Sequence, residues 1–434
     1  MKKNKVDENK LSGRSYREYV IKQFKKNRLA VISLYIIIVL AFVALFADFL
    51  ANEKPIVCSY KGKIYFPVLK QYAVDLNIGQ WDEEFQNIPS WKDLPYDWAV
   101  FPPVPYLPKN IDFDNAQSVG PFDKQFVKSW RWRHWLGTDE LGRDVLAGMI
   151  HGTRIALLVG FVSMGIAAVI GILIGSLAGF LGDQKLKMTV AGIIFNLLAL
   201  FFGIFYGFGS RSYILKEALG NSMFHFIGEL MVSLFIIAVI FLVFNLMAKG
   251  LQNAGFFGKK VSVPVDIIIS RLIELMLSIP TLFLIISIAA ISKPSIFTVM
   301  AIIGFTSWTG IARFIRAELL RIRSLEFIEA AYALGFKERR ILLKHAIPNA
   351  LSPVFVAIAF GIASAILIEA TLSFIGIGVP AETVTWGSLL SAARQSSGAW
   401  WLAIIPGFAI FLTVTIYNLV GEGLTDALDP RQKR

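Results

Sequence analysis

The sequence predicts an all-α membrane protein with about eight membrane-spanning helices. Of the 434 residues, 55% are hydrophobic, only 17% are charged and 35 are phenylalanine. The mean hydropathy of +0.60 is far above that of a soluble domain. Apolar runs of roughly 20 residues, the length that crosses a bilayer, also recur along the chain.

Eight apolar runs give the predicted spans. They lie approximately at residues 29–50, 154–181, 188–209, 226–247, 265–290, 296–316, 350–376 and 400–421. The first run, Leu29 to Leu50, follows a basic flank as a signal-peptide core does, but it exceeds the usual length of such a core and no clean small-x-small cleavage site follows it. We therefore interpret this run as a retained membrane anchor.

The distribution of positive charge predicts that both termini are cytoplasmic. The net charge of +12 is compatible with nucleic acid, an anionic lipid surface or cytoplasmic loops. About ten basic residues lie in 1–28, and an even number of spans places the basic stretches 249–260, 321–345 and 430–434 on the same side. This agreement follows the positive-inside rule. We therefore expect a lipid bilayer as a partner and no nucleic acid.

Residues 51–153 are predicted to lie outside the cytoplasm. This segment is rich in proline and aromatic residues and its charges balance, so we expect either a small folded or docked element or a spacer without ligand contacts. The lone cysteine, Cys58, cannot form an internal disulfide. Trp130, Trp132 and Trp135 alternate with basic groups, as residues at a bilayer interface do. Stacking on nucleic acid would use the same residue types, but the external position disfavours it.

The stretch from Glu329 to Asn349, EAAYALGFKERRILLKHAIPN, interrupts the spans with two short amphipathic segments. In the first, apolar residues recur at three- and four-residue steps, which predicts a helix whose inner face carries Leu325, Ile328, Ala331 and Leu334. Gly335 follows where a helix stop belongs, because glycine adopts the left-handed conformation without steric cost.

The second segment is predicted to be a helix from Lys337 to His345, basic on one side. Its other side carries three apolar residues, Ile341, Leu342 and Leu343, and Pro348 is expected to end it before the next span. Such a helix, corner and helix could act as a lever that a soluble partner moves. The same pattern fits an amphipathic hairpin resting on lipid headgroups, so both interpretations stay open at this point.

The same stretch resembles the EAA loop of bacterial ABC importer permeases. In addition, WLGTDELGRDVLAGMIHGTRIALLVG, LIEATLSFIGIGV, WGSLL and GLTDALDPR resemble runs of the C-type permease subunit of dipeptide and oligopeptide importers, in the right order. The resemblance covers roughly 29–50, 131–182 and 264–431. It implies a type I importer transmembrane domain with a six-span core. Within it we expect TDELGRD, residues 138–144, to form a structural turn rather than a direct substrate contact.

The resemblance also implies a function. The chain would be a permease subunit in the bacterial cytoplasmic (inner) membrane, forming half of the path by which an ATP-driven importer moves short peptides. Its partners would be a second permease subunit, two ATP-binding subunits and an extracytoplasmic substrate-binding protein. The resemblance to the EAA loop implies that seven residues of this chain contact the ATPase: Glu329, Ala330, Ala331, Gly335, Lys337, Arg339 and Arg340. Nickel or glutathione is an alternative cargo of the same architecture.

The residues predict no chemistry on the chain itself. The nearest approach to a phosphate loop, NAGFFGKK, has Asn253 in place of the first glycine and Lys260 in place of Ser or Thr. The four histidines are scattered without metal-ligand spacing, and no nucleophile motif is present. We therefore expect no cofactor, metal or catalytic residue here, with ATP and magnesium on the ATPase subunits. A membrane receptor or scaffold docking a cytoplasmic partner is a rival function, and a membrane-embedded enzyme is a third.

Polar groups within the spans are candidates for the translocation path or gate, because burying them in the membrane is costly. Glu369 is one, and its alternative role is a hydrogen bond to a neighbouring helix. Glu274 stands three residues after Arg271, so the two could instead form a local ion pair. Pro280 is expected to bend or loosen the same helix, which could serve a gate.

Residues 183–263 depart from the six-span family pattern by adding two apolar runs. We interpret them as a lipid-facing hairpin in which Glu229 and Asn245 should face protein. The expected organisation is a basic cytoplasmic N-terminus, an anchor, an extracytoplasmic segment, a first core part, the hairpin, a second core part with its cytoplasmic loop at 317–349, and a cytoplasmic tail. In order, these are residues 1–28, 29–50, 51–153, 154–182, 183–263, 264–421 and 422–434.

Overall fold

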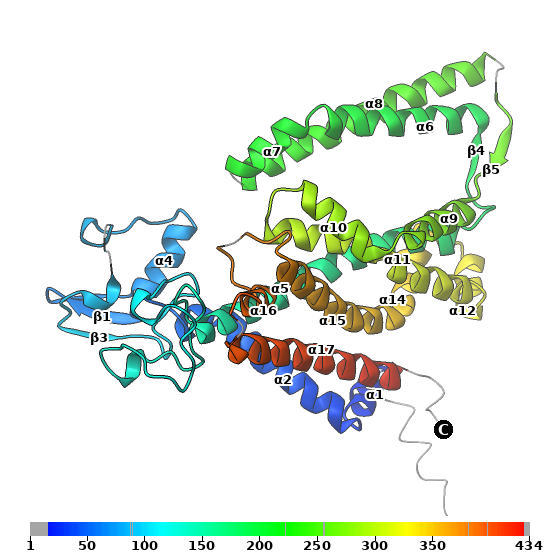
Figure 1. The fold of residues 1–434 in the computed structure, drawn as a ribbon. Coiled ribbons are helices and arrows are strands. Elements are labelled where there is room, and N and C mark those ends of the chain that lie inside the picture. The colour runs from blue at the N-terminus through cyan, green and yellow to red at the C-terminus, as the bar shows by residue number, and fades with distance from the viewer. Residues whose placement is uncertain are drawn as a thin grey trace, which may run out of the picture. The chain divides into compact units, whose positions relative to one another are not determined.

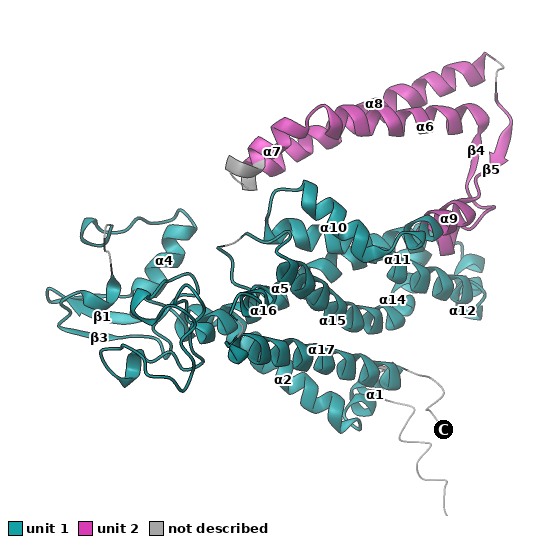
Figure 2. Ribbon diagram, viewed as in Figure 1, with its two compact units in different colours: residues 1–176, 273–434 teal, residues 177–272 magenta. Residues whose placement is uncertain are grey.

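The computed structural model describes residues 16–86, 88, 90–221, 223–254, 257–380, 382–396 and 398–428. The chain divides into two compact units, one of residues 1–176 with 273–434 and one of residues 177–272 (Figure 2). Asp429 and the basic ends 1–15 and 430–434, which entered the charge argument, lie outside the described residues.

Long apolar helices form the bundle of the first unit (Figure 1). They are α2 (Arg28–Leu45), α5 (Val145–Ser176), α11 (Ile296–Ile322), α15 (Ser352–Ile375) and α17 (Trp400–Leu428). Helix α5 packs against α11 and α15, and α17 packs against α15 and α2. Glycine allows close packing of these helices: a Cβ at Gly175 of α5 would lie 2.5 Å from the carbonyl oxygen of Ala312 in α11.

The number of spans agrees with the sequence prediction, but one span is broken. Within the described residues, seven helices are long and apolar enough to cross a membrane, and α9 (Val265–Ser278) with α10 (Thr281–Ile291) makes an eighth if this pair is one span. The pair is bent by 79°. The break falls at Pro280, which lacks a backbone N–H and disfavours helix in the residue before it. The bend predicted there is therefore present.

Several other helices, including α5 and α11, begin or end away from the predicted positions. Helix α5 begins at Val145 instead of residue 154, because Asp144 caps it: the Asp144 Oδ1 accepts the backbone N–H of Ala147 at 2.6 Å. Helix α11 continues to Ile322, six residues past the predicted end, and its last turns bury Leu319 and Ile322. A π-helical turn, Leu177–Leu181, prolongs α5 to residue 181 as predicted.

The second unit is a helical hairpin (Figure 2). It contains α6 (Val190–Ile204) with a π-helical turn (Phe205–Gly209), α7 (Ser212–Asn221) and α8 (Met223–Asn253), and the short strands β4 (Lys187–Thr189) and β5 (Lys260–Ser262) pair antiparallel at its base. Helix α8 packs against α6 and α7. As predicted, its polar residues face protein: Glu229 pairs with Arg211, and the Asn245 side chain donates to Asn196 at 3.3 Å.

Residues 51–144 form a small folded domain, here called the aromatic domain. The strands β1 (Val57–Tyr60), β2 (Lys63–Tyr65) and β3 (Trp98–Val100) make an antiparallel sheet in the order β2-β1-β3, beside helix α4 (Pro67–Asp75). Short 3-10 turns complete the domain. Because of its sheet, this part of the chain is not all-helical. Phe85 and Trp91 stack in its core with ring centroids 5.4 Å apart. Cys58 is buried and free, and burial raises the pKa of its thiol to about 11.

Candidate coupling site

Helix α12 (Glu326–Ala333) begins the predicted lever. Glu326 and Glu329 lie in its first turn, where acidic groups favour the positive end of the helix dipole. Ile328 and Ala331 are buried as predicted. The prediction is wrong for Leu334, which is 73% exposed, because this residue is the C-cap and the chain turns away from the buried face there.

Gly335 makes the corner that the sequence predicts. Its φ is +74°, in the left-handed region. Its N–H donates to Tyr332 O at 2.9 Å, and the N–H of Phe336 donates to Ala331 O at 3.1 Å. This pair of bonds is the Schellman ending of a helix, which satisfies carbonyls that the helix leaves free.

The chain after the corner stays helical through Pro348. Helix α13 (Glu338–Ile341), a π-helical turn (Leu342–Ala346) and α14 (Ile347–Ala350) follow one another, and α15 starts at Ser352. The prediction that Pro348 ends this helix is therefore wrong. Pro348 lies in the first turn of α14, and the wider π-helical turn before it accommodates a residue without a backbone N–H.

The apolar face of this second segment is narrower than predicted. Ile341 is fully buried, Leu342 is half-buried and Leu343 is 52% exposed, so the three apolar residues do not share one buried face. The turn from α13 into the π-helical segment changes the angular step per residue, which moves Leu343 outward.

Phe336 contacts two side chains, Arg340 and His345, an arrangement that the sequence does not predict. The Arg340 guanidinium lies 4.4 Å from the centroid of the Phe336 ring. The His345 ring is nearly parallel to the same ring, at 6.3 Å and 8°. The available signal was an aromatic residue directly after a corner glycine with an arginine four positions later, a spacing that suits a cation–π contact.

The predicted coupling residues gather at one exposed corner. Six are solvent-exposed: Glu329, Ala330, Gly335, Lys337, Arg339 and Arg340. Ala331 is buried and contributes to the attachment of α12 instead. Lys337 is the N-cap of α13, and Arg339 and Arg340 lie in the last turn of that helix. The corner therefore presents a basic second helix beside an acidic first turn.

A cleft of about 880 Å³ lies where the segment that carries the corner joins the bundle, because it is lined by residues from the start of α12 and from α14. It is bordered by helix α1 (Tyr16–Phe24) and by the ends of α11, α15 and α17. Its lining includes Tyr19, Leu325, Pro348, Thr425 and Leu428. The corner and the C-terminal end of α17 therefore lie at the same end of the bundle.

The aromatic domain contacts the other end of α17. The Trp401 indole N–H donates to Thr138 O at 3.1 Å. Ser118 of the domain and Ser396, just before α17, share a 2.8 Å hydrogen bond. Since α17 has 29 residues at about 1.5 Å rise per residue, roughly 40 Å separates its two ends. The corner and the aromatic domain thus lie at opposite ends of a membrane-length helix.

Residues 138–144 form the structural turn that the sequence predicts. The Asp139 carboxylate accepts the backbone N–H groups of Leu141 and Arg143, and it pairs with the Arg143 side chain at 2.6 Å. Gly142 has a φ of +84°. The turn ends at Asp144, the cap of α5, and so fixes the aromatic domain to the start of that helix.

His134 ties the same cap to the aromatic domain. The fully buried ring lies 2.8 Å from Asp144 Oδ2 through Nδ1 and 3.2 Å from Asp112 Oδ2 through Nε2, and Tyr106 packs on it with centroids 4.2 Å apart. Burial by itself lowers the pKa of His134, but the hydrogen bonds to Asp112 and Asp144 outweigh it and leave the pKa raised. Among the described residues, no group of His, Cys, Asp and Glu has a metal-binding arrangement.

The structure does not bring the three predicted path residues together. Glu369 is 1% exposed and accepts the Ser373 hydroxyl at 2.6 Å on its own helix. Thr385, the N-cap of α16 (Trp386–Ala393), also hydrogen-bonds to it. Glu274 and Pro280, by contrast, are exposed on either side of the break between α9 and α10. A role of any of these residues in a path or gate stays a prediction.

Comparison with known proteins identifies the family. Residues 254–434 match the model of the binding-protein-dependent transport system inner membrane component, and residues 15–63 match the N-terminal TM domain of oligopeptide transport permease C. The dipeptide transport system permease protein DppC of Alkalihalophilus pseudofirmus is 30% identical over 301 residues, covering 69% of this chain and 73% of that protein. The chain belongs to this family of ABC importer permeases.

Two relatives match the permease over nearly its whole length. The inner membrane ABC transporter permease protein YejE of Escherichia coli is 27% identical over 413 residues, which cover 94% of this chain and 96% of that protein. The peptidoglycan transport system permease protein YejE of Agrobacterium fabrum is 25% identical over 436 residues, covering 94% and 91%. The resemblance inferred from the EAA loop and its companion runs is thus confirmed, and the permease is a multi-pass protein of the inner membrane.

Proposed function

We propose that this permease forms half of the translocation path of an ATP-driven importer of short peptides. The observation that carries the proposal is the exposed corner at Gly335, at one end of α17, with the aromatic domain at the other end. A coupling surface on one side of the membrane and a folded domain on the other are what an importer subunit requires.

The proposed orientation puts the corner and both termini in the cytoplasm. ATP and magnesium would act on two separate ATPase subunits below the corner, and a second permease would complete the path. An extracytoplasmic binding protein would deliver cargo on the side of the aromatic domain. A Lys337→Cys variant tests the orientation, because the native Cys58 is buried. An impermeant thiol reagent should label it in inverted vesicles and not in intact cells; labelling of intact cells would overturn the orientation.

The geometry supports a mechanical role for the corner. The α12 helix is anchored by buried Ile328 and Ala331, while α13, the π-helical turn and α14 lead into α15 with only Leu351 between α14 and α15. Movement of the corner by closing ATPase subunits would therefore pass along helical backbone into α15. Repositioning of a bundle helix between two packed states is a rigid-body switch, so no chemistry on this chain is needed.

Peptide cargo is supported by the names of the relatives. One is a dipeptide permease, and one family model describes an oligopeptide permease. Peptidoglycan fragments are a second candidate cargo, favoured by a relative with that name which matches 94% of this chain. Peptidoglycan itself contains short peptides, so the two candidates share a chemical class.

Uptake by proteoliposomes tests the proposal. The permease with its copurifying partners should accumulate a labelled mixture of short peptides only when ATP is supplied. If a different solute stimulates the ATPase and no peptide is taken up, the chain is an importer subunit but peptides are not its cargo. If the protein purifies without any associated ATPase, the proposal of an importer is wrong and a membrane receptor or scaffold is the better-supported function.

A further inference from the structure

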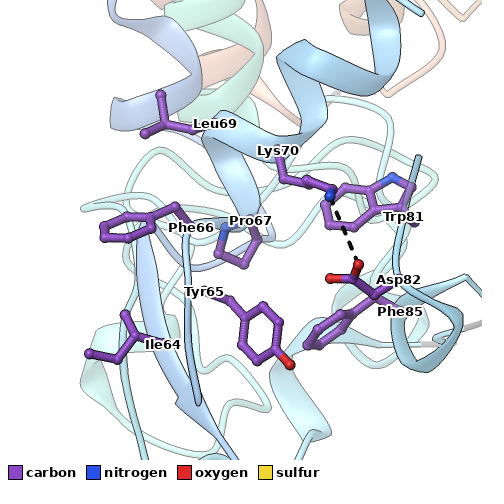
Figure 3. Close-up of a pocket in the computed structure, with 9 residues that line it drawn as sticks. All are labelled: Ile64, Tyr65, Phe66, Pro67, Leu69, Lys70, Trp81, Asp82 and Phe85. Carbon is purple, nitrogen blue, oxygen red and sulfur yellow. Dashed lines mark ion pairs between the residues drawn. The ribbon is translucent and has the colours of Figure 1, made fainter. Parts of the chain in front are cut away.

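The aromatic domain contains an open pocket of about 390 Å³ (Figure 3). Its volume falls in the range of about 300–1,000 Å³ that is usual for small-ligand sites. The wall is built from the end of β2, the start of α4 and the 3-10 turn at residue 83. It is lined by Ile64, Tyr65, Phe66, Pro67, Leu69, Lys70, Trp81, Asp82 and Phe85.

Packed aromatic rings form the floor of the pocket. Phe85 is 5% exposed and stacks on Trp91 with an interplanar angle of 9°, while Tyr65 meets the Phe85 ring edge-on at 4.9 Å. Trp81 also packs on Trp91, at 5.4 Å. The Lys54 ammonium lies 5.3 Å from the Trp81 ring. An aromatic floor fixed in this way needs little reorganisation to receive an apolar side chain.

The rim of the pocket exposes three apolar side chains. Ile64 is 62% exposed, and Phe66 and Leu69 are each 52% exposed. Exposed apolar residues on the bundle helices are expected to face lipid, but these three belong to a folded domain beyond the start of α5. A concentration of exposed apolar residues around a concave site marks a place where a ligand binds.

Two opposite charges stand at the pocket. The Lys70 ammonium and the Asp82 carboxylate point toward each other (Figure 3), with Nζ and Oδ1 3.9 Å apart. This separation is at the outer limit of an ion pair, and the two side chains remain 39% and 54% exposed. An exposed pair of this kind contributes little to the stability of the fold. Lys70 and Asp82 can therefore separate at a small cost in free energy and form stronger ion pairs with the charged groups of a ligand.

We propose that this pocket binds a short zwitterionic peptide that carries a bulky apolar side chain. The peptide carboxylate pairs with Lys70 and its ammonium group with Asp82, and the apolar side chain lies on the floor formed by Tyr65, Trp81 and Phe85. The inference rests on the proposed function, because peptides are the cargo and the aromatic domain would lie on the side from which they arrive. The pocket would hold cargo close to the mouth of the path.

Binding of the dipeptide Leu-Phe to the purified full chain in detergent, measured by isothermal titration calorimetry, tests the inference. Lys70→Met and the near-isosteric Asp82→Asn should each weaken binding about tenfold or more. N-acetyl-Leu-Phe-amide, which lacks both charges, should bind the wild-type chain more weakly than Leu-Phe binds either variant, because each variant loses only one of the two ion pairs. The matched control is Lys61→Met, which removes an exposed lysine paired with Glu84 on the same domain at 3.2 Å and should leave binding unchanged.

Three results would each contradict the proposal that this pocket binds a peptide. They are no binding of Leu-Phe by the wild-type chain, equal binding by Lys70→Met and Asp82→Asn, and a loss in Lys61→Met as large as theirs. If Lys70→Met and Asp82→Asn instead lose the extracytoplasmic binding protein while peptide binding is absent, the pocket is a protein-docking surface and the inference is wrong. The binding assay contains no ATPase, so ATP-dependent uptake that persists without pocket binding would leave the proposed function standing.

Discussion

Two glycine corners at opposite ends of α17 use the same backbone conformation in different surroundings. Gly335 has a φ of +74° and Gly142 a φ of +84°. A Cβ at Gly335 would meet no atom within 4 Å, whereas a Cβ at Gly142 would lie 2.1 Å from the carbonyl oxygen of Asp112. The first corner is open and the second is closed by the aromatic domain. The open corner leaves room for the proposed partner, whereas the closed corner is packed into the fold.

The largest expected effect is on stability, from Gly142→Ala. The substitution combines a disfavoured φ, which costs about 1–2 kcal/mol, with a collision against backbone that cannot move aside easily. We expect a loss of about 3–5 kcal/mol in the free energy of unfolding. The buried thiol of Cys58 gives a direct measurement, because a thiol-reactive dye reports thermal opening of the aromatic domain.

Gly335→Ala is the matched control for that prediction. It meets the same φ penalty without a collision, so it should cost only about 1 kcal/mol. Equal melting temperatures for the two alanine variants would show that the packing around the two corners does not affect stability differently.

The next effect is on transport, from Gly335→Asp. The aspartate places a charge and a side chain on the surface proposed to meet the ATPase, while the space around the corner keeps the fold intact. We expect ATP-dependent uptake to fall more than about tenfold, with a stability loss of only about 1–2 kcal/mol. Gly335→Asn is the control, since asparagine tolerates the left-handed region and carries no charge. Undiminished uptake by the aspartate variant would remove the lever interpretation.

A smaller, pH-dependent effect is expected from His134 at the closed end. Its pKa is raised in the folded protein by Asp112 and Asp144, so the stabilisation is complete below the unfolded value of about 6.5 and is lost as pH rises through the folded pKa. Lys92 lies over Tyr106 in the same cluster, and burial lowers its pKa to about 8. The effect of Lys92 has the opposite sign, because its pKa is lowered in the folded protein, and it develops as pH rises through about 8.

Thermal unfolding of the wild-type protein and His134→Asn between pH 6 and pH 8 measures this effect. The melting temperature of the wild-type protein should fall with rising pH across this window, and that of the variant should change less. A parallel pH dependence in the two proteins would exclude His134 as the charged member of the cluster. Lys92→Met should leave the difference between them in place, because Lys92 remains largely protonated through most of this window.

The sequence predicts the open end of the molecule better than the closed end. Gly335 and the buried Ile328 and Ala331 follow from spacing within one helix, so local rules locate them. The closed end depends on contacts between distant residues. Val57 pairs with Val100 in the sheet, and His134 meets Asp112, 22 positions earlier. No periodicity in the chain encodes those partners.

Pro348 illustrates a different limit of sequence reasoning. Proline rules predict a helix end there, but a single π-helical turn, Leu342–Ala346, keeps the helix continuous into α14. The choice depends on burial of Ile341 and Ala346 against the bundle, which favours continued helix over a break. Tertiary packing therefore decided between two local outcomes that the residues alone leave open.

The smallest predicted effect tests which contact holds the open corner in its conformation, since the corner lacks the close packing that surrounds Gly142. Arg340→Gln removes the cation from above Phe336, a contact worth about 0.5–1 kcal/mol at an exposed site. Because Phe336 also carries a hydrogen bond of the helix ending, we expect a two- to fivefold loss of uptake, on the order of that energy. Arg339→Gln is the matched control, because it removes an equal charge from the same helix and leaves the contact of Arg340 with Phe336 in place. If the two variants lose uptake equally, the basic charge of the corner matters and the stacking on Phe336 does not.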